Sequence, residues 1–221
     1  MRDNAERVAQ LEDVLAQMLQ RIRGIPFSVI VKALAKRSII AINGKAAQDK
    51  KLVSLLSRTA IRAGQATQKQ PIVRPRPNEV GNDIEAYVID AANKIGLRCA
   101  RPLTASGAGK STGYPDILLH DEDNRPTYLE CKIYALGKAP NTMRSFYLSP
   151  SENFKITQDA RHLLMAFGMS ATPSGGQNVE YRAMEFKLVD LHDLLCDVKY
   201  EFNSDNRRLY ADDLVLASGA I

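Results

Sequence analysis

The chain has 221 residues, 45% of them hydrophobic and 6% aromatic, and a formal net charge of +5. This composition supports a folded core, which excludes a wholly disordered chain, and the length suits one medium domain with an appended arm. No apolar run approaches the roughly 20 residues that span a bilayer. Neither the charged start nor the widely spaced cysteines indicate a secreted protein. We therefore expect a cytoplasmic protein with no membrane partner.

Residues 5–22 are predicted to form a helix with a narrow apolar seam. The seam residues recur at spacings of three and four: Val8, Leu11, Leu15, Met18 and Ile22. Such a seam packs either on the core of its own chain or on a partner helix in a dimer, and the sequence leaves both possibilities open.

Positive charge is concentrated between Lys32 and Arg76. This segment holds eleven basic residues against the single acid Asp49, a net charge of +10, so the rest of the chain carries −5. A basic block beside an acidic body indicates a polyanionic partner, most commonly nucleic-acid phosphate. A solvated helical surface is the alternative, since residues 27–41 and 47–63 are predicted helices.

An extended linker is predicted over residues 64–77, because polar residues there lead into Arg74-Pro75-Arg76-Pro77. We therefore divide the chain into a basic, helical region at residues 1–77 and a second region at residues 78–221. The first region is expected to serve dimerisation and contact with a polyanion.

Helices and strands alternate in the second region. The expected elements are a helix over 79–96, a strand over 97–100, a loop over 103–113, strands over 116–120 and 127–135, a helix over 156–168, a strand over 181–188 and a short helix over 190–196. This order predicts an α/β (α+β) fold with a mixed β-sheet flanked by helices.

The two middle strands carry the residues best suited to chemistry. Because side chains alternate along a strand, the second strand has an apolar face for the core, formed by Leu129, Cys131 and Ile133. Glu130 and Lys132 then share the other face, which we expect to be open. Asp116 starts the first strand directly after Pro115, and it lies near Glu130 if the two strands are neighbours.

Two carboxylates held close together either raise a pKa or bind a cation. Oxygen ligands with no His or Cys nearby suit Mg²⁺, which keeps several waters and accepts phosphate oxygens as further ligands. Such an ion would activate water toward a phosphodiester, while Lys132 would orient that water or stabilise the added negative charge. A plain ion pair between Glu130 and Lys132 is the alternative.

The motif Pro115-Asp116 followed by Glu130-Cys131-Lys132 resembles that of the PD-(D/E)xK nuclease superfamily, and within it the chain most resembles type II restriction endonucleases. The resemblance implies a restriction-endonuclease-like core in residues 78–221. It also implies a Mg²⁺-dependent homodimer that cuts double-stranded DNA at a specific sequence, leaving 5′-phosphate and 3′-hydroxyl ends.

The same resemblance implies the roles of the site residues. Asp116 and Glu130 would hold the metal, and Lys132 would serve the attacking water. Glu85, on the preceding predicted helix, would be the further acid and an added ligand of the metal or its water, with Glu79 as its alternate.

Contacts with DNA are expected from basic and polar residues outside the motif: Arg74, Arg76, Lys110, Ser111, Lys138, Asn141, Arg144 and Lys155. In the major groove, Arg suits guanine and Asn suits adenine. Residues 106–112 look like the end of a P-loop, but Thr104 stands where its first glycine is needed, so no nucleotide cofactor is expected.

His162 is more often a helix-surface residue than a catalytic one.

Two other functions are compatible with the sequence. The chain could also be a structure-selective repair or junction nuclease. A DNA-binding regulator without enzymatic activity, in which the acids and Lys132 form only an ion pair, is the third possibility.

Overall fold

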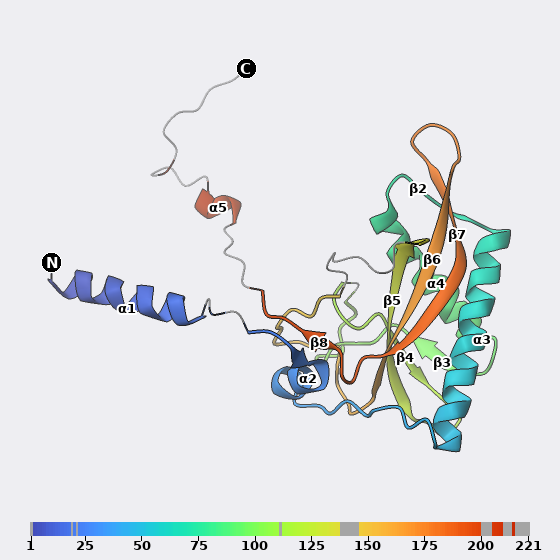
Figure 1. Cartoon of the computed structure of the whole chain (residues 1–221), viewed down its shortest axis with the longest axis horizontal. Helices are drawn as coiled ribbons and strands as arrows, with labels where there is room; N and C mark the ends of the chain where they lie inside the picture. Colours follow the sequence, from blue (N-terminus) through green and yellow to red (C-terminus); the bar gives the residue numbers. More distant parts are fainter. Residues whose placement is uncertain are drawn as a thin grey trace. The chain divides into compact units, whose positions relative to one another are not determined.

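A six-stranded mixed sheet with the strand order β2-β7-β6-β5-β4-β3 forms the centre of this computed structural model (Figure 1). The structure describes residues 2–18, 20, 22–110, 112–137, 146–199, 205–209 and 214. β5 and β6 are parallel, and the other neighbouring strands are antiparallel. The predicted mixed sheet flanked by helices is therefore confirmed.

The described helices are α1 (Arg2–Met18), α2 (Phe27–Ala35), α3 (Ala47–Lys69), α4 (Pro77–Asn93) and α5 (Asn206–Leu209). The strands of the large sheet are β2 (Ile72–Arg74), β3 (Arg98–Ala100), β4 (Ile117–His120), β5 (Pro126–Ala135), β6 (Arg161–Pro173) and β7 (Val179–Asp190). β1 (Ile25–Pro26) and β8 (Leu195–Cys196) form a separate two-stranded sheet.

The chain divides into two compact units, one of residues 26–195 and one of residues 1–25 with 196–221. The large sheet and helices α2, α3 and α4 belong to the first unit. None of the helices in the described part of the chain combines the length and hydropathy needed to cross a membrane.

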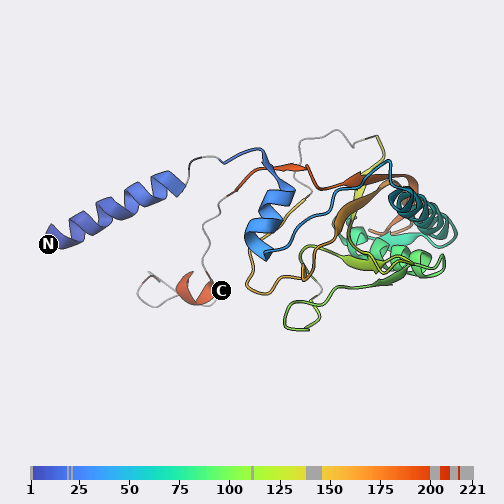
Figure 2. The same ribbon diagram turned by 90° about the horizontal axis from the view of Figure 1, so that it is seen from below.

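Helices α3 and α4 pack on the face of the sheet that carries the apolar side chains of β5. The core there includes Leu56 of α3, Ile84 and Val88 of α4, and Leu129 and Cys131 of β5. Figures 1 and 2 show α2 on the other side of the strands from α3. The two faces of the sheet are thus covered by different parts of the chain.

The predicted linker over 64–77 is wrong, because α3 continues to Lys69 and residues 72–74 form β2. The polar residues that suggested a linker have partners on β7. The Thr67 hydroxyl accepts a hydrogen bond from the Ala183 N–H at 2.9 Å, and the Gln68 amide donates to the Ala183 carbonyl at 2.7 Å. These contacts stabilise the last turns of a helix that sequence composition disfavours.

The predicted helix over 156–168 is also wrong, because residues 161–173 form β6. β6 lies between β5 and β7 and is buried on both faces over most of its length. A strand buried on both faces shows a continuous apolar run without alternation, which sequence periodicity does not distinguish from a buried helix. The short helix predicted over 190–196 is likewise replaced by a turn and β8.

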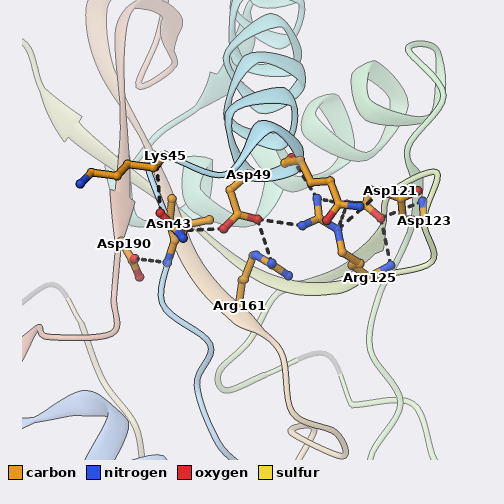
Figure 3. A network of polar contacts seen from close by, with 10 residues as sticks. Asn43, Lys45, Asp49, Asp121, Asp123, Arg125, Arg161 and Asp190 are labelled. Carbon is orange, nitrogen blue, oxygen red and sulfur yellow. Dashed lines mark hydrogen bonds and ion pairs between the residues drawn. The ribbon is translucent and has the colours of Figure 1, made fainter.

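Asp49, the single acid of the basic segment, is used inside the protein (Figure 3). It lies in the first turn of α3, is 3% exposed, and pairs at 2.8 Å with both Arg125 and Arg161. Its other oxygen accepts the Asn43 N–H at 2.8 Å. This network joins the start of α3 to the turn before β5 and to the start of β6.

Candidate active site

The pairing of β4 with β5 brings Asp116 and Glu130 together. Ile117 is paired with Leu129, so continuing this antiparallel register by one residue places Asp116 opposite Glu130. The Asp116 carboxylate accepts the Cys131 N–H at 2.8 Å, which fixes it against β5. The expected proximity of the two acids is therefore present in the structure.

The four residues of the predicted catalytic set line one cleft of about 400 Å³. Glu85 comes from α4, Asp116 from the residue directly before β4, and Glu130 and Lys132 from β5. Glu79, the alternate acid, is not among the residues that line this cleft. A larger cavity of about 880 Å³ beside β3 shares only Arg101 with it and has no acid among its described lining residues.

Glu130 is a buried acid, and only one of its two carboxylate oxygens has a hydrogen-bond partner among the described residues. It is 4% exposed, and its Oε1 accepts a hydrogen bond from Lys132 Nζ at 2.5 Å. Its Oε2 is buried and has no hydrogen-bond partner among the described residues. A buried carboxylate oxygen without a partner is costly, so this atom is a ready ligand for a cation.

Burial and the negative charge of Asp116 raise the pKa of Glu130 to about 7. The same two causes, in the same order, raise the pKa of Glu85 to about 7, although Arg101 lies 3.2 Å from its Oε2. Burial acts to lower the pKa of Lys132, but Glu130 and Asp116 outweigh it and raise that pKa. The cleft thus favours a positive charge beside its acids.

These observations test whether a divalent metal fits the cleft. No group of three or more His, Cys, Asp or Glu side chains in the described ranges is arranged to hold a metal ion. Mg²⁺, however, is commonly bound through one or two carboxylates, with waters and substrate phosphates as the remaining ligands. The unpartnered Oε2 of Glu130, opposite Asp116, fits such a partial oxygen site.

The β5 face that carries Glu130 is not open along its whole length, which corrects the expectation. Tyr128 on that face is fully buried. Its ring packs against that of His162, with the two ring centroids 5.0 Å apart. The ring centroid of Phe27 in α2 lies 6.1 Å from that of His162. Tyr128 and Glu130 are buried on this face, whereas Lys132 and Tyr134 are partly exposed.

His162 lies on β6 rather than on a helix surface. It is fully buried, its Nδ1 is 2.6 Å from the Tyr114 hydroxyl, and it does not line the cleft. Burial lowers the pKa of His162 to about 3. The ring is therefore neutral at physiological pH and packs in the core.

The predicted DNA-contacting residues fall in different environments. Lys110 is exposed and lines a smaller cavity of about 200 Å³ that shares four residues with the catalytic cleft. Arg74 pairs with Asp83 at 2.7 Å but remains half-exposed, and Arg76 is exposed directly before α4. Lys155 is buried, at 4% exposure. Four further predicted contacts lie outside the described residues: Ser111, Lys138, Asn141 and Arg144.

Sequence reasoning missed three residues that line the cleft: Asn82, Arg101 and Tyr147. Asn82 could have been found, because it precedes Glu85 by three residues on a predicted helix and therefore shares its face. Arg101 follows a short strand and belongs to no motif. Its place beside Glu85 depends on how β3 packs next to α4.

Comparisons with known proteins give a consistent result. A model of the type II restriction enzyme MjaV family matches residues 19–213. The type II restriction enzyme MjaV of Methanocaldococcus jannaschii is 35% identical over 229 residues, and the alignment covers 97% of each chain. No solved structure gives a significant match.

Proposed function

The chain belongs to the type II restriction enzyme MjaV family, and from this we propose that it is a sequence-specific endonuclease that hydrolyses double-stranded DNA with Mg²⁺ held by Asp116 and Glu130. Enzymes of this class are site-specific deoxyribonucleases. Family membership therefore decides against a non-enzymatic regulator and against a nuclease selective for branched DNA.

The observation that carries the metal proposal is the position of Asp116 opposite Glu130, one residue beyond the paired Ile117 and Leu129, beside a buried carboxylate oxygen that has no hydrogen-bond partner among the described residues. When bound, Mg²⁺ lowers the pKa of a water molecule and offsets negative charge on the phosphate. Glu85 supports the two ligands from α4. Waters and phosphate oxygens of DNA would complete the metal's ligands.

Lys132 supplies the fixed positive charge of the reaction. Its ammonium is hydrogen-bonded to Glu130 and partly exposed to the cleft. It orients the attacking water or stabilises the charge that develops on the phosphate oxygens. Cleavage of the bond between phosphorus and the 3′ oxygen leaves 5′-phosphate and 3′-hydroxyl ends.

We keep the expectation that DNA is held outside the catalytic set by basic and polar side chains. Lys110 beside the cleft, together with Arg74 and Arg76 before α4, would contact phosphates. Ser111, Lys138, Asn141 and Arg144 remain candidates from sequence alone. The division of roles between residues 1–77 and residues 78–221 also remains a prediction.

Digestion of unmethylated phage DNA tests the metal and the products. With Mg²⁺ we expect discrete fragments that T4 ligase rejoins, and in EDTA we expect uncut DNA. Phosphatase treatment should prevent rejoining, because it removes the 5′-phosphates. Full cutting in EDTA would contradict the metal proposal, whereas fragments that ligate only after phosphorylation would contradict the proposed ends.

We also propose that the enzyme is a homodimer in which α1 helices pair. The α1 seam and Ile22 are 41–56% exposed and recur at the three- and four-residue spacing of a coiled coil. Changing Leu11 and Leu15 to Asp should weaken dimerisation by more than about a hundredfold, since each leucine loses roughly 1.5–3 kcal/mol of burial.

Sedimentation at several protein concentrations measures this effect. Gln10→Asp, which adds a charge on α1 outside the seam, is the matched control and should leave the dimer intact. A wild-type monomer, or equal dimerisation of all variants, would remove α1 from the interface.

A further inference from the structure

We propose that Lys155 is a positioning residue for DNA cleavage, whose ammonium holds the turn at residues 113–115 so that Asp116 stays opposite Glu130. This inference rests on the proposed function of the cleft. It assigns Lys155 a different role from the DNA contact that the sequence suggested.

The first observation is the environment of the ammonium. Lys155 is 4% exposed, and its Nζ donates to the Gly113 carbonyl at 2.6 Å and to the Pro115 carbonyl at 3.0 Å. An ammonium has three donors and no acceptor, and its burial is costly unless these donors are used. Two of its donors are committed to the residues that lead directly into Asp116.

The second observation is that this turn lies outside the strand ladder. Regular pairing between β4 and β5 begins only at Ile117. Side chains must therefore hold the preceding residues in place. Tyr114 is anchored in the core through its hydroxyl, 2.6 Å from His162 Nδ1, and its ring centroid lies 5.3 Å from that of Phe27.

The third observation is that the turn sets the position of a functional carboxylate. Asp116 is tied to β5 by the hydrogen bond that its carboxylate accepts from the Cys131 N–H at 2.8 Å. A shift of the turn would move Asp116 away from Glu130 while leaving the sheet intact. A misplacement of about 1 Å in such a site can reduce the rate by about a hundredfold.

Lys110 provides the contrast. It lines the same small cavity as Lys155, but it is exposed, so its ammonium is available to a phosphate. The two lysines of this cavity thus face different surroundings. The Lys155 ammonium faces the backbone of the turn, whereas Lys110 faces solvent. They form a matched pair for an experiment.

The test compares Lys155→Met, which keeps the apolar stem and removes the ammonium, with Lys155→Arg, Tyr114→Phe and Lys110→Met. Cleavage of a labelled fragment that the wild type cuts once is followed with enzyme in excess and Mg²⁺ present. Binding of the same fragment is measured in EDTA by fluorescence anisotropy at several salt concentrations. Each variant is assayed at a temperature below its own melting temperature.

We expect Lys155→Met to lower the single-turnover rate by at least about a hundredfold, with the Kd for DNA within about twofold of wild type and the same salt dependence. Lys155→Arg should restore part of the rate, and Tyr114→Phe should lower it by roughly tenfold, because one anchor of the turn remains. Lys110→Met should instead weaken binding and reduce the salt slope by about 1.

Two results would overturn the inference: a wild-type cleavage rate in Lys155→Met, or a loss of affinity and salt slope that matches Lys110→Met. If Lys155→Met does not fold, unchanged rates in both Lys155→Arg and Tyr114→Phe overturn it, and reduced rates with unchanged Kd support it. Absence of cleavage by the wild type would contradict the proposed function instead.

Discussion

Asp116→Asn is expected to lower the single-turnover rate of DNA cleavage by at least roughly a thousandfold. The amide keeps the size of the side chain, and its oxygen can still accept the Cys131 N–H. It lacks the anionic oxygen that would hold Mg²⁺ beside Glu130. The variant should therefore fold and bind DNA like the wild type while failing to cut.

Lys132→Met is expected to have an effect of similar size for a different reason. The substitution removes the ammonium that donates to Glu130 Oε1, so both the charge in the cleft and the orientation of that carboxylate are lost. Removal of one such electrostatic contact costs about a hundred- to a thousandfold in rate.

Cleavage of a labelled fragment under enzyme excess measures both effects. Asp90→Asn is the matched control, because Asp90 is an exposed acid of α4 whose ion pair with Lys94 lies outside the cleft. It should cut at the wild-type rate. Cleavage by Asp116→Asn within tenfold of wild type would remove that residue from the metal site.

Asp49→Ala is expected to destabilise the protein by about 3–5 kcal/mol, the usual cost of removing one partner of a buried ion pair. The change leaves Arg125 and Arg161, both mostly buried, without the carboxylate that joins them. It also removes the acceptor for the Asn43 N–H. Urea unfolding at neutral pH measures the loss.

The pH dependence of this effect follows from the pKa of Asp49. Burial acts to raise that pKa, but the Asn43 N–H and the two arginines outweigh it and lower the pKa. A depressed pKa stabilises the fold above the unfolded value of about 3.9, and this contribution is lost as the pH falls through the folded value. The difference between Asp49→Ala and wild type should therefore shrink below about pH 4.

Asp90→Ala is again the control, because an exposed ion pair within a helix contributes about 0.3–0.5 kcal/mol. A loss for Asp49→Ala no larger than that of Asp90→Ala would show that the network does not support the fold. A difference that grows with acidity would contradict the assigned direction of the pKa shift.

The sequence by itself determined which candidate residues share one face of β5. Strand periodicity around Leu129 and Cys131 fixes which face carries Glu130 and Lys132, since successive side chains point to opposite faces. The register between β4 and β5 stayed open in the sequence, and only the pairing of Ile117 with Leu129 in the folded sheet places Asp116 opposite Glu130. Local spacing is enough for the face of β5, because the direction of successive side chains along a strand depends only on their position in the chain.

Only the tertiary structure decided which other residues belong to the site. Arg101 lines the cleft beside Glu85, whereas Lys155 turns inward to the carbonyls before Asp116 and His162 lies in a central strand. A lysine's own sequence neighbours do not reveal whether water or a distant carbonyl will face its ammonium. That choice depends on burial and on partners from remote segments, which exist only once the sheet and its helices have packed.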